Sequence, residues 1–333
     1  MSVQHVMVTG GAGYVGSGLV QDLVRRGYQV TCVDKLLWGG ESILGLLHDP
    51  GFRFKKLDVC DHKAVRDLVE ELRPDAIVHL AAIVGDPACK HEPEFATATN
   101  WEASKNLVDV AAAVGVKRFV FASTCSNYGK MANPESYITE ESPLAPVSLY
   151  AELKVRFERY LLDELPRSND LISTALRFST VYGVSPRMRF DLTVNEFTKD
   201  VTMGKKLEIF GEQFWRPYCH VADFSRAFIT VLEAEPAKVD REVFNVGSTA
   251  ENYTKKMLSE EIRKVVPEAR ICFVRRDEDP RDYKVSFEKI ERTLGFEVTR
   301  SVPEGIVEVN RAVRDGMIRN PEDPIYYNVP CVR

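Results

Sequence analysis

The sequence predicts an α/β protein: a doubly wound parallel sheet of the Rossmann type with a smaller C-terminal α/β domain. Three observations support this prediction. Short, nearly continuous apolar segments alternate with segments of helical period through the first half of the chain. A glycine-rich turn joins the first apolar segment to the first helical one. Beyond residue 180, short elements alternate with turn-rich segments, which suits a smaller domain built beside the sheet.

The first predicted unit is a strand, a turn, a helix and a second strand. Residues 6–9 form a short apolar run, and residues 16–26 carry apolar side chains at helical spacing. Gly27 closes this helix, as a glycine after the last helical residue commonly does. Residues 29–34 form the second strand, so the unit spans about 30 residues, the size of a mononucleotide-binding unit.

The alternation continues to residue 180. The sequence predicts further strands at 53–59, 76–82, 118–124 and 172–180, and helices at 63–72, 94–114 and 149–165. Nearly continuous apolar strands separated by helices are typical of a parallel sheet that helices cover on both faces.

The composition is that of an ordinary globular protein. Of the 333 residues, 44% are hydrophobic and 28% are charged, which argues against disorder. At roughly 150 residues per domain, the length predicts about two domains. The formal net charge is -5 and no block of basic residues is present, so we expect no nucleic-acid partner.

The cysteines, histidines and apolar runs exclude other classes of protein. The seven cysteines are scattered without a CxxC pair, which is typical of reduced thiols in the cytoplasm. The six histidines show no metal-ligand spacing, so we expect no metal. We find neither a run of 18 apolar residues nor a signal peptide, and we therefore expect a cytoplasmic protein without a membrane partner.

A dinucleotide-binding motif occupies the first glycine turn, where residues 9–16 read TGGAGYVG. Gly10 permits the tight turn, Gly13 lets the backbone approach a pyrophosphate, and Gly16 allows the helix to pack closely on the strand. The N-terminus of the following helix offers N–H groups to the phosphates. Because a strand precedes the motif and a helix follows it, we favour dinucleotide binding over a purely structural turn.

The ends of the next two strands indicate which dinucleotide binds. Asp34 ends the second strand, where a carboxylate holds the adenosine ribose hydroxyls and repels a 2′-phosphate. The sequence therefore favours NAD over NADP, and Lys35 partly offsets that repulsion. Asp58, at the end of the third strand, can face the adenine amino group.

Tyr150 and Lys154 form a predicted catalytic pair. They lie four residues apart on a predicted helix and share one face. A neighbouring ammonium favours the phenolate, so we expect Lys154 to lower the pKa of Tyr150 toward a value suited to a general base. Thr124, at the end of the preceding strand, adds a hydroxyl. A hydrolase is not expected, because Thr124 has no evident histidine partner and no GxSxG motif is present.

These motifs resemble those of one family. TGGAGYVG, HLAA at 79–82, Asn100, STCSNYG at 123–129, YxxxK and LRFSTVYG at 176–183 occur in an order and at distances similar to those of the extended short-chain dehydrogenase/reductases that act on nucleotide sugars. That family includes 4-epimerases, 4,6-dehydratases and decarboxylases. RPYCHVAD at 216–223, FNVG at 244–247 and DPR at 279–281 also match its landmarks.

The resemblance implies tightly bound NAD, oxidation of the sugar at C4 by Thr124, Tyr150 and Lys154, and a homodimer formed through the helices that precede and carry Tyr150. It also implies an NAD-binding Rossmann domain at 1–180 and a region at 181–333 that mainly binds the nucleotide sugar, with some segments free to return to the sheet. The residues expected to contact NAD are Gly10, Gly13, Tyr14, Val15, Gly16, Asp34, Asp58, Val59, Leu80, Ala81, Ala82, Asn100, Tyr150 and Lys154.

Residues 181–191, VYGVSPRMRFD, resemble a narrower branch that includes NAD-dependent enzymes oxidising C4 of nucleotide heptoses, such as GDP-heptose 4-dehydrogenases, beside proteins described as epimerases, such as UDP-glucose 4-epimerases. Arginine guanidinium groups suit diphosphate oxygens. The residues expected to contact the nucleotide sugar are Cys125, Ser126, Thr180, Arg187, Arg189, Asn195, Arg216 and Arg281.

The residues after Thr124 decide between the reactions. The 4,6-dehydratases of the family carry Asp-Glu there, whereas this chain has Cys125 and Ser126, and neither is a carboxylic acid. Cys125 is either an acid/base group facing the sugar or a small buried side chain. We therefore expect 4-epimerisation through a 4-keto intermediate, with a C4 dehydrogenase as the alternative, then a 4,6-dehydratase. A non-catalytic NAD-binding protein is disfavoured, because Thr124, Tyr150 and Lys154 are all present.

Overall fold

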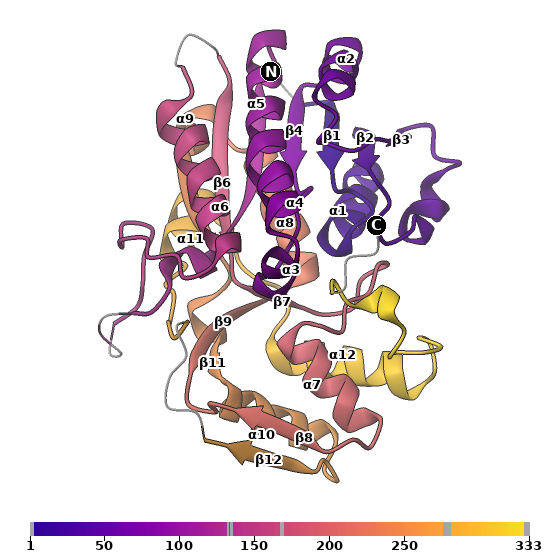
Figure 1. The fold of residues 1–333 in the computed structure, drawn as a ribbon, viewed down its shortest axis with the longest axis vertical. Coiled ribbons are helices and arrows are strands. Elements are labelled where there is room, and N and C mark those ends of the chain that lie inside the picture. Colours follow the sequence, from indigo (N-terminus) through magenta and orange to yellow (C-terminus); the bar gives the residue numbers. More distant parts are fainter. Residues whose placement is uncertain (1–2, 132, 134–135, 167–169, 276–280, 330–333) are drawn as a thin grey trace.

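Seven parallel strands form the central sheet of the computed structural model, which describes residues 3–131, 133, 136–166, 170–275 and 281–329 (Figure 1). Their order is β10-β6-β5-β4-β1-β2-β3. The strands are β1 (His5–Thr9), β2 (Gln29–Asp34), β3 (Phe52–Lys56), β4 (Ala76–His79), β5 (Arg118–Thr124), β6 (Ile172–Phe178) and β10 (Glu242–Val246). The order reverses between β1 and β4, as in a doubly wound fold, which confirms the predicted fold class.

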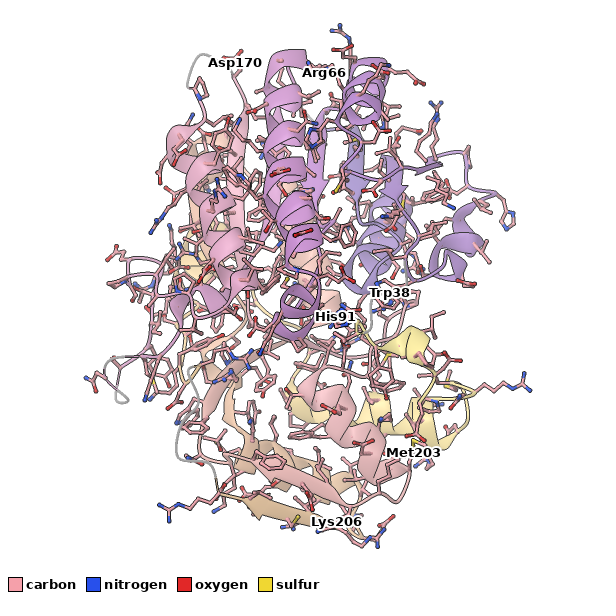
Figure 2. The ribbon with its side chains drawn as sticks, viewed as in Figure 1. Trp38, Arg66, His91, Asp170, Met203 and Lys206 are labelled. Atoms are coloured by element: carbon pink, nitrogen blue, oxygen red, sulfur yellow. The ribbon has the colours of Figure 1, made fainter. Side chains whose placement is uncertain are left out.

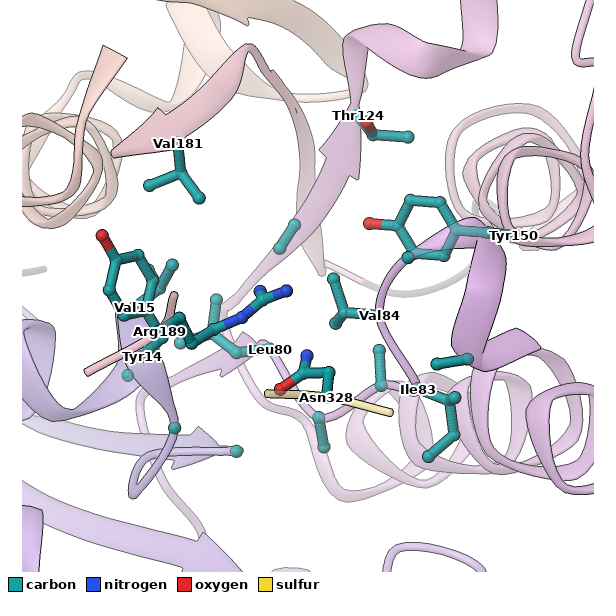
Figure 3. Close-up of a pocket in the computed structure, with 18 of the residues that line it drawn as sticks. Tyr14, Val15, Leu80, Ile83, Val84, Thr124, Tyr150, Val181, Arg189 and Asn328 are labelled. Atoms are coloured by element: carbon teal, nitrogen blue, oxygen red, sulfur yellow. The ribbon is translucent and has the colours of Figure 1, made fainter. Parts of the chain in front are cut away.

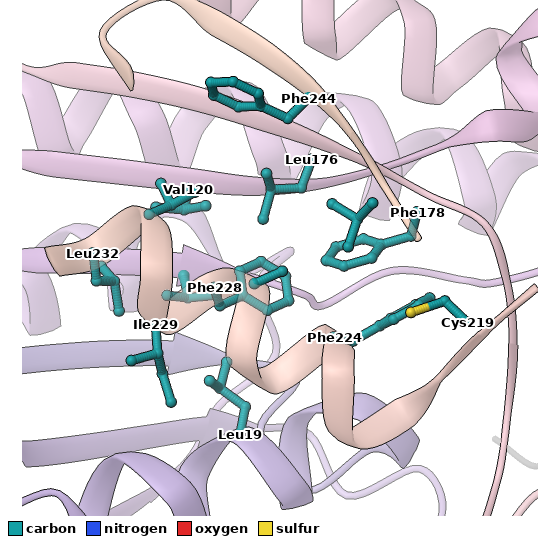
Figure 4. Close-up of a cluster of buried hydrophobic side chains, with 14 of the residues drawn as sticks. Leu19, Val120, Leu176, Phe178, Cys219, Phe224, Phe228, Ile229, Leu232 and Phe244 are labelled. Atoms are coloured by element: carbon teal, nitrogen blue, oxygen red, sulfur yellow. The ribbon is translucent and has the colours of Figure 1, made fainter. Parts of the chain in front are cut away.

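Helices cover both faces of this sheet. One face is covered by α1 (Tyr14–Arg25), α8 (Val221–Glu233) and α11 (Glu288–Leu294). The other is covered by α2 (His62–Leu72), α5 (Ser104–Val114) and α6 (Leu149–Arg159). Side chains alternate along β1, where Val6 and Val8 face α1 and Met7 faces the α2–α5 side. Figure 4 shows the first of these cores, in which Phe228 of α8 lies between the strand residue Val120 and Leu19 of α1.

The C-terminal part lies below the sheet in Figure 1. It contains a three-stranded sheet of β7 (Thr180–Tyr182), β9 (Trp215–His220) and β11 (Asn252–Thr254). It also contains the pair β8 (Leu207–Phe210) and β12 (Ile271–Val274), with α7 (Thr193–Thr202), α10 (Lys255–Val265) and α12 (Val302–Arg314). Three short helices complete the described chain: α3 (Asp86–His91), α4 (Pro93–Thr97) and α9 (Pro236–Val239).

Several elements beyond residue 180 return to the Rossmann part, among them β10, α8 and α11. Strand β10 pairs with β6 at the edge of the central sheet, and α8 packs against α1. The predicted strand at 172–180 is two strands, β6 and β7, which belong to different sheets. The predicted helix at 94–114 is α4, a π-helical segment at Ala98–Ala103 and α5. In the described part of the chain, no helix is long and apolar enough to cross a membrane.

Candidate active site

A cavity of about 690 Å³ lies at the carboxyl ends of the central strands, where the two parts of the chain meet (Figure 3). Ligands of open parallel sheets bind at this edge. Its walls come from the β1–α1 turn, the ends of β2 and β5, the loop after β4, α6, residues 178–193 and residues 327–329. Figure 2 places Trp38, another lining residue, at the level where the two parts meet.

The glycine turn leaves space for a diphosphate along one wall. Gly10 has φ of 73°, and a Cβ there would lie 2.7 Å from the backbone nitrogen of Ala81. A Cβ at Gly16 would lie 2.7 Å from the Cα of Gly11, so strand and helix approach as closely as the motif predicts. Helix α1 begins at Tyr14 without an acidic residue in its first turn, and its free backbone N–H groups can donate hydrogen bonds to an anion. These residues fit a dinucleotide.

Asp34 and Asp58 line the end of the cavity next to β2 and β3, the end at which the sequence predicts the adenosine. The carboxylate of Asp34 accepts hydrogen bonds from the backbone N–H groups of Ala12 (3.0 Å) and Leu36 (2.7 Å). Burial raises the pKa of Asp34, and these two bonds oppose the rise. The Lys35 ammonium lies 2.7 Å from Asp58 Oδ2, so its charge is paired with Asp58. Burial would raise the pKa of Asp58, but the bonds from Lys35 and the Cys60 N–H outweigh burial and lower it.

Arg187 lies at this same end, although the sequence assigns it to the substrate. Its guanidinium carbon lies 4.9 Å from the centre of the Trp38 ring. Its positive charge also opposes the rise in the pKa of Asp34. One guanidinium nitrogen donates to Asn328 Oδ1 at 3.0 Å, and the buried Nε has no hydrogen-bond partner among the described residues. Arg187 thus lies in the cavity lining beside Trp38 and Asn328.

The predicted catalytic residues Thr124, Tyr150 and Lys154 line one wall together. Thr124 ends β5, and Tyr150 lies in the first turn of α6, whose N-cap Ser148 accepts a hydrogen bond from the backbone of Ala151 (3.3 Å). Figure 3 shows the Tyr150 hydroxyl pointing into the cavity. The Lys154 ammonium donates to the carbonyl oxygen of Ala122 at 2.8 Å.

The expected lowering of the Tyr150 pKa is wrong for this structure. Burial raises its pKa, electrostatic interactions with Cys89 and Asp86 add to the rise, and Arg189 and a hydrogen bond with Thr124 oppose it. Burial also lowers the pKa of Lys154 to about 8. The reason is that both groups are buried, which disfavours a phenolate and an ammonium alike.

A buried polar network holds α6 against the sheet behind these residues. Glu158 of α6 and Arg177 of β6 form an ion pair of 2.5 Å, with side chains 3% and 6% exposed. Ser123, next to Thr124, donates to Glu158 Oε2 at 2.6 Å, and Tyr128 accepts from Arg177 at 2.8 Å. The network fixes the spacing between β5 and α6. The sequence reasoning missed it, because its charged members lie on separate elements without a motif.

Four predicted contact residues lie outside the cavity lining: Asn100, Cys125, Asn195 and Arg216. The side-chain amide of Asn100 accepts a hydrogen bond from the backbone N–H of Ile83 and donates one to its carbonyl oxygen, so Asn100 shapes the loop after β4. The Cys125 thiol is 1% exposed and donates to the carbonyl oxygen of Arg177 at 3.2 Å. Burial raises its pKa, so the structure places Cys125 as a small buried side chain, not as an acid/base group facing the sugar.

The other two of these four residues have structural contacts. Asn195 bonds the backbone N–H of Gly183 (2.9 Å) and the carbonyl of Arg189 (2.9 Å). Arg216 donates to the carbonyl of Trp215 (2.6 Å), and its guanidinium lies 5.4 Å from the ring centre of Tyr283, a lining residue.

The remaining predicted residues line the cavity: Gly10, Gly13, Tyr14, Val15, Gly16, Asp34, Asp58, Val59, Leu80, Ala81, Ala82, Ser126, Thr180, Arg187, Arg189 and Arg281. Arg189 crosses the middle of the cavity in Figure 3 and is held by both oxygens of Asp191 (2.8 and 2.9 Å). Of the DPR landmark, Asp279 and Pro280 lie outside the described residues. Asp86 lines the same cavity, and the sequence reasoning did not single it out. Among the described residues, no cluster of His, Cys, Asp and Glu is arranged to hold a metal ion.

Comparison with known proteins places this geometry in a family. The model of the NAD dependent epimerase/dehydratase family matches residues 6–247. A dTDP-glucose 4,6-dehydratase of Streptomyces niveus is 32% identical over 324 residues, covering 93% of each chain. A UDP-glucose 4-epimerase of Bacillus subtilis is 26% identical, covering 90% of this chain and 94% of that protein.

Solved structures agree with the sequence relatives. The UDP-glucose 4-epimerase of Thermotoga maritima with UDP-glucose superposes with a TM-score of 0.83 at 28% identity, covering 94% of this chain and all of the other. The Thermus thermophilus UDP-glucose 4-epimerase in complex with NAD gives 0.81 at 26% identity, covering 93% and 99%. The match over residues 6–247, the glycine turn and the Thr124–Tyr150–Lys154 wall together show that this chain is an enzyme of the NAD-dependent epimerase/dehydratase family.

Proposed function

We propose that this enzyme interconverts nucleotide sugars that differ in configuration at C4, through a 4-keto intermediate. The observation that carries the proposal is the placement of the two residues that follow Thr124 in the sequence. Cys125 is turned into the core, and Ser126 is the next residue along the chain that lines the cavity. Loss of water across C5 and C6 needs an acid and a base, and neither of these positions supplies a carboxylic acid. Epimerisation needs only a proton acceptor at O4 and space for the ketone to turn.

The residues of this chain then take distinct roles. The glycine turn, Asp34 and Lys154 would hold NAD, which when bound supplies a hydride acceptor and a positively charged ring. Tyr150 takes the proton of the sugar 4-hydroxyl and returns it to the ketone. Thr124 orients that hydroxyl by a hydrogen bond. The Lys154 ammonium, whose nitrogen lies 5.9 Å from the centre of the Tyr150 ring, would stabilise the phenolate by its positive charge.

A 4,6-dehydratase is the second candidate, and two observations favour it. The Streptomyces niveus relative described as a dTDP-glucose 4,6-dehydratase matches over 93% of each chain. In addition, the Asp86 carboxylate lies near Tyr150, so the cavity contains an acid elsewhere than beside Thr124.

Product analysis distinguishes these candidates. The purified protein with NAD is incubated with UDP-, GDP-, dTDP- and CDP-sugars, and products are separated by chromatography and weighed by mass spectrometry. The proposal predicts a pair of isomers of equal mass that reaches the same ratio from either side, and isomer formation that is about 10²–10⁴-fold slower with Tyr150→Phe. A product lighter by one water, or net accumulation of NADH with a product lighter by two hydrogens, would replace it with the dehydratase or the C4 dehydrogenase.

We also propose a homodimer formed through α5 and α6, which lie on one outer side of the sheet (Figure 1). Half-buried aromatic side chains lie in the π-helical segments that precede α5 and follow α6: Trp101 packs edge-on against Tyr160, and the exposed Arg156 of α6 stacks on Trp101 at 3.8 Å. Aromatic residues and arginine are enriched at protein interfaces. Light scattering should give twice the monomer mass of 37.6 kDa, and a clean monomer would reject the proposal.

A further inference from the structure

Asp86 is an acid in the cavity wall for which the proposed reaction gives no role. It begins α3, directly after the loop that follows β4. Its Oδ1 accepts a hydrogen bond of 2.7 Å from Ser148, the N-cap of the helix that carries Tyr150. Because Ser148 caps the helix that carries Tyr150, this bond places the carboxylate at the end of the cavity that Tyr150 lines, and its negative charge contributes to the raised pKa of Tyr150. Ser148 thereby holds the carboxylate in a fixed relation to the proton acceptor.

Asp86 is held less firmly than Asp34 and Asp191, two other carboxylates of the described lining, whereas Asp58 pairs with the partly exposed Lys35. Asp34 is held by backbone N–H groups, and Asp191 is held by both donors of Arg189 and by the Asn328 backbone. Asp86 instead accepts a bond of 2.8 Å from Arg281, whose side chain is 40% exposed. A partly exposed ion pair is weak, because water screens it and the long side chain loses freedom in forming it.

A diphosphate entering this end of the cavity competes with Asp86 for Arg281. It carries more negative charge than one carboxylate, and guanidinium groups bind phosphate oxygens in a forked geometry. Once Arg281 turns to the diphosphate, Asp86 keeps its bond from Ser148 and presents a free oxygen to the sugar. Hydroxyl groups can donate to that oxygen, whereas a carboxylate on the sugar would be repelled by it.

We propose that Asp86 is a specificity-determining residue that selects neutral glycosyl groups, through hydrogen bonds from their hydroxyls, and disfavours glycosyl groups that carry a carboxylate. This inference rests on the proposed function, since it assumes that a nucleotide sugar occupies the cavity. Two like charges within about 7 Å, at an effective dielectric constant of about 20, change a binding constant by roughly fiftyfold. We therefore expect discrimination between tenfold and a hundredfold.

The test compares ligands that differ only in that charge. Binding of UDP-glucose and UDP-glucuronate, and of GDP-mannose and GDP-mannuronate, is measured by calorimetry on the NAD-loaded protein. In Asp86→Asn the shape and the bond from Ser148 are kept while the charge is removed. Glu94→Gln is the matched control, because Glu94 is an exposed acid of the neighbouring α4 that does not line the cavity.

The natural protein and Glu94→Gln should bind the neutral member of a pair at least tenfold more tightly, and Asp86→Asn should reduce that ratio by tenfold or more. Arg281→Gln should weaken both members by a similar factor and leave the ratio above ten. If the ratio of the two binding constants is unchanged in Asp86→Asn, with both sugars still bound, this inference alone is overturned. It is also overturned if that ratio falls to near one in Arg281→Gln. If the natural protein binds no member of either pair, the inference is overturned, and the proposed function is then decided separately by the product analysis with the four classes of nucleotide sugar.

Discussion

Replacing Lys154 with methionine is expected to stabilise the cofactor-free protein while removing its activity. The Lys154 side chain is 4% exposed. Its ammonium contacts the carbonyl oxygen of Ala122 and lies 4.6 Å from the ring centre of Phe121, and neither group is a carboxylate. Burial therefore lowers the pKa of Lys154 from its ordinary value of 10.5 to about 8. Methionine fills a similar volume without a charge.

The expected gain in the free energy of unfolding follows from this shift in the pKa of Lys154. One pKa unit corresponds to about 1.4 kcal/mol, so keeping Lys154 protonated in the folded state costs about 3 kcal/mol at neutral pH. Losing the hydrogen bond to Ala122 removes about 1 kcal/mol. The net gain in the free energy of unfolding is thus about 2 kcal/mol. Because the folded-state pKa lies below the unfolded one, the penalty is complete below pH 8 and disappears as the pH rises from 8 to 10.5.

Urea unfolding of the NAD-free protein at pH 7.5 and pH 10 measures this directly. Lys117→Met, at an exposed lysine, is the matched control for general effects of removing a charge. Lys154→Met should exceed the natural protein in stability at pH 7.5 and lose most of that advantage at pH 10. A variant that is less stable at pH 7.5, or whose gain does not change with pH, would refute the account of Lys154 as a buried and uncompensated cation.

Three further substitutions test the site and its support. Tyr150→Phe should lower kcat by about 10²–10⁴-fold while NAD stays bound, because general-base catalysis contributes on that scale; near-normal turnover would remove Tyr150 from its assigned role. Asp34→Ala should narrow the preference for NAD over NADP measured by calorimetry, and tighter binding of NADP to the natural protein would contradict the role of Asp34. Glu158→Gln should lower the free energy of unfolding by about 3 kcal/mol or more in urea, since it leaves Arg177 buried without its counter-charge; a loss below 1 kcal/mol would show that the pair is not important for stability.

The sheet and the catalytic wall were accessible from sequence because their signals are local. The predicted bounds of β2 and β5 agree with the structure, since each is a short apolar run bounded by turns. The spacing of Tyr150 and Lys154 predicts one helix face, and both side chains line the cavity. Strand β10 could not be placed, because its residues pair with residues 68 positions earlier, such as Glu242 with Thr174, and such pairing leaves no local pattern.

The features of the site that the sequence did not reveal depend on the paths of the loops and on the depth of burial. Nothing in the spacing of residues 183–192 tells which end of the cavity this loop crosses, and Arg187 lies beside Trp38 at the end where the sequence predicts the adenosine. Asp86 lies in a six-residue helix too short to show a period. The rise in the Tyr150 pKa follows from the depth of burial, which a pair of residues four apart does not encode.

The central claim, reversible redox chemistry at C4 without loss of water, is tested most directly in D₂O. The NAD-loaded enzyme is incubated with the nucleotide sugar on which it acts, and the product is analysed by mass spectrometry and NMR. The account predicts an isomer of unchanged mass with no solvent deuterium on any sugar carbon, because Tyr150 exchanges only the proton on oxygen. Deuterium at C5 together with the loss of one water would contradict it and show that the enzyme is a 4,6-dehydratase.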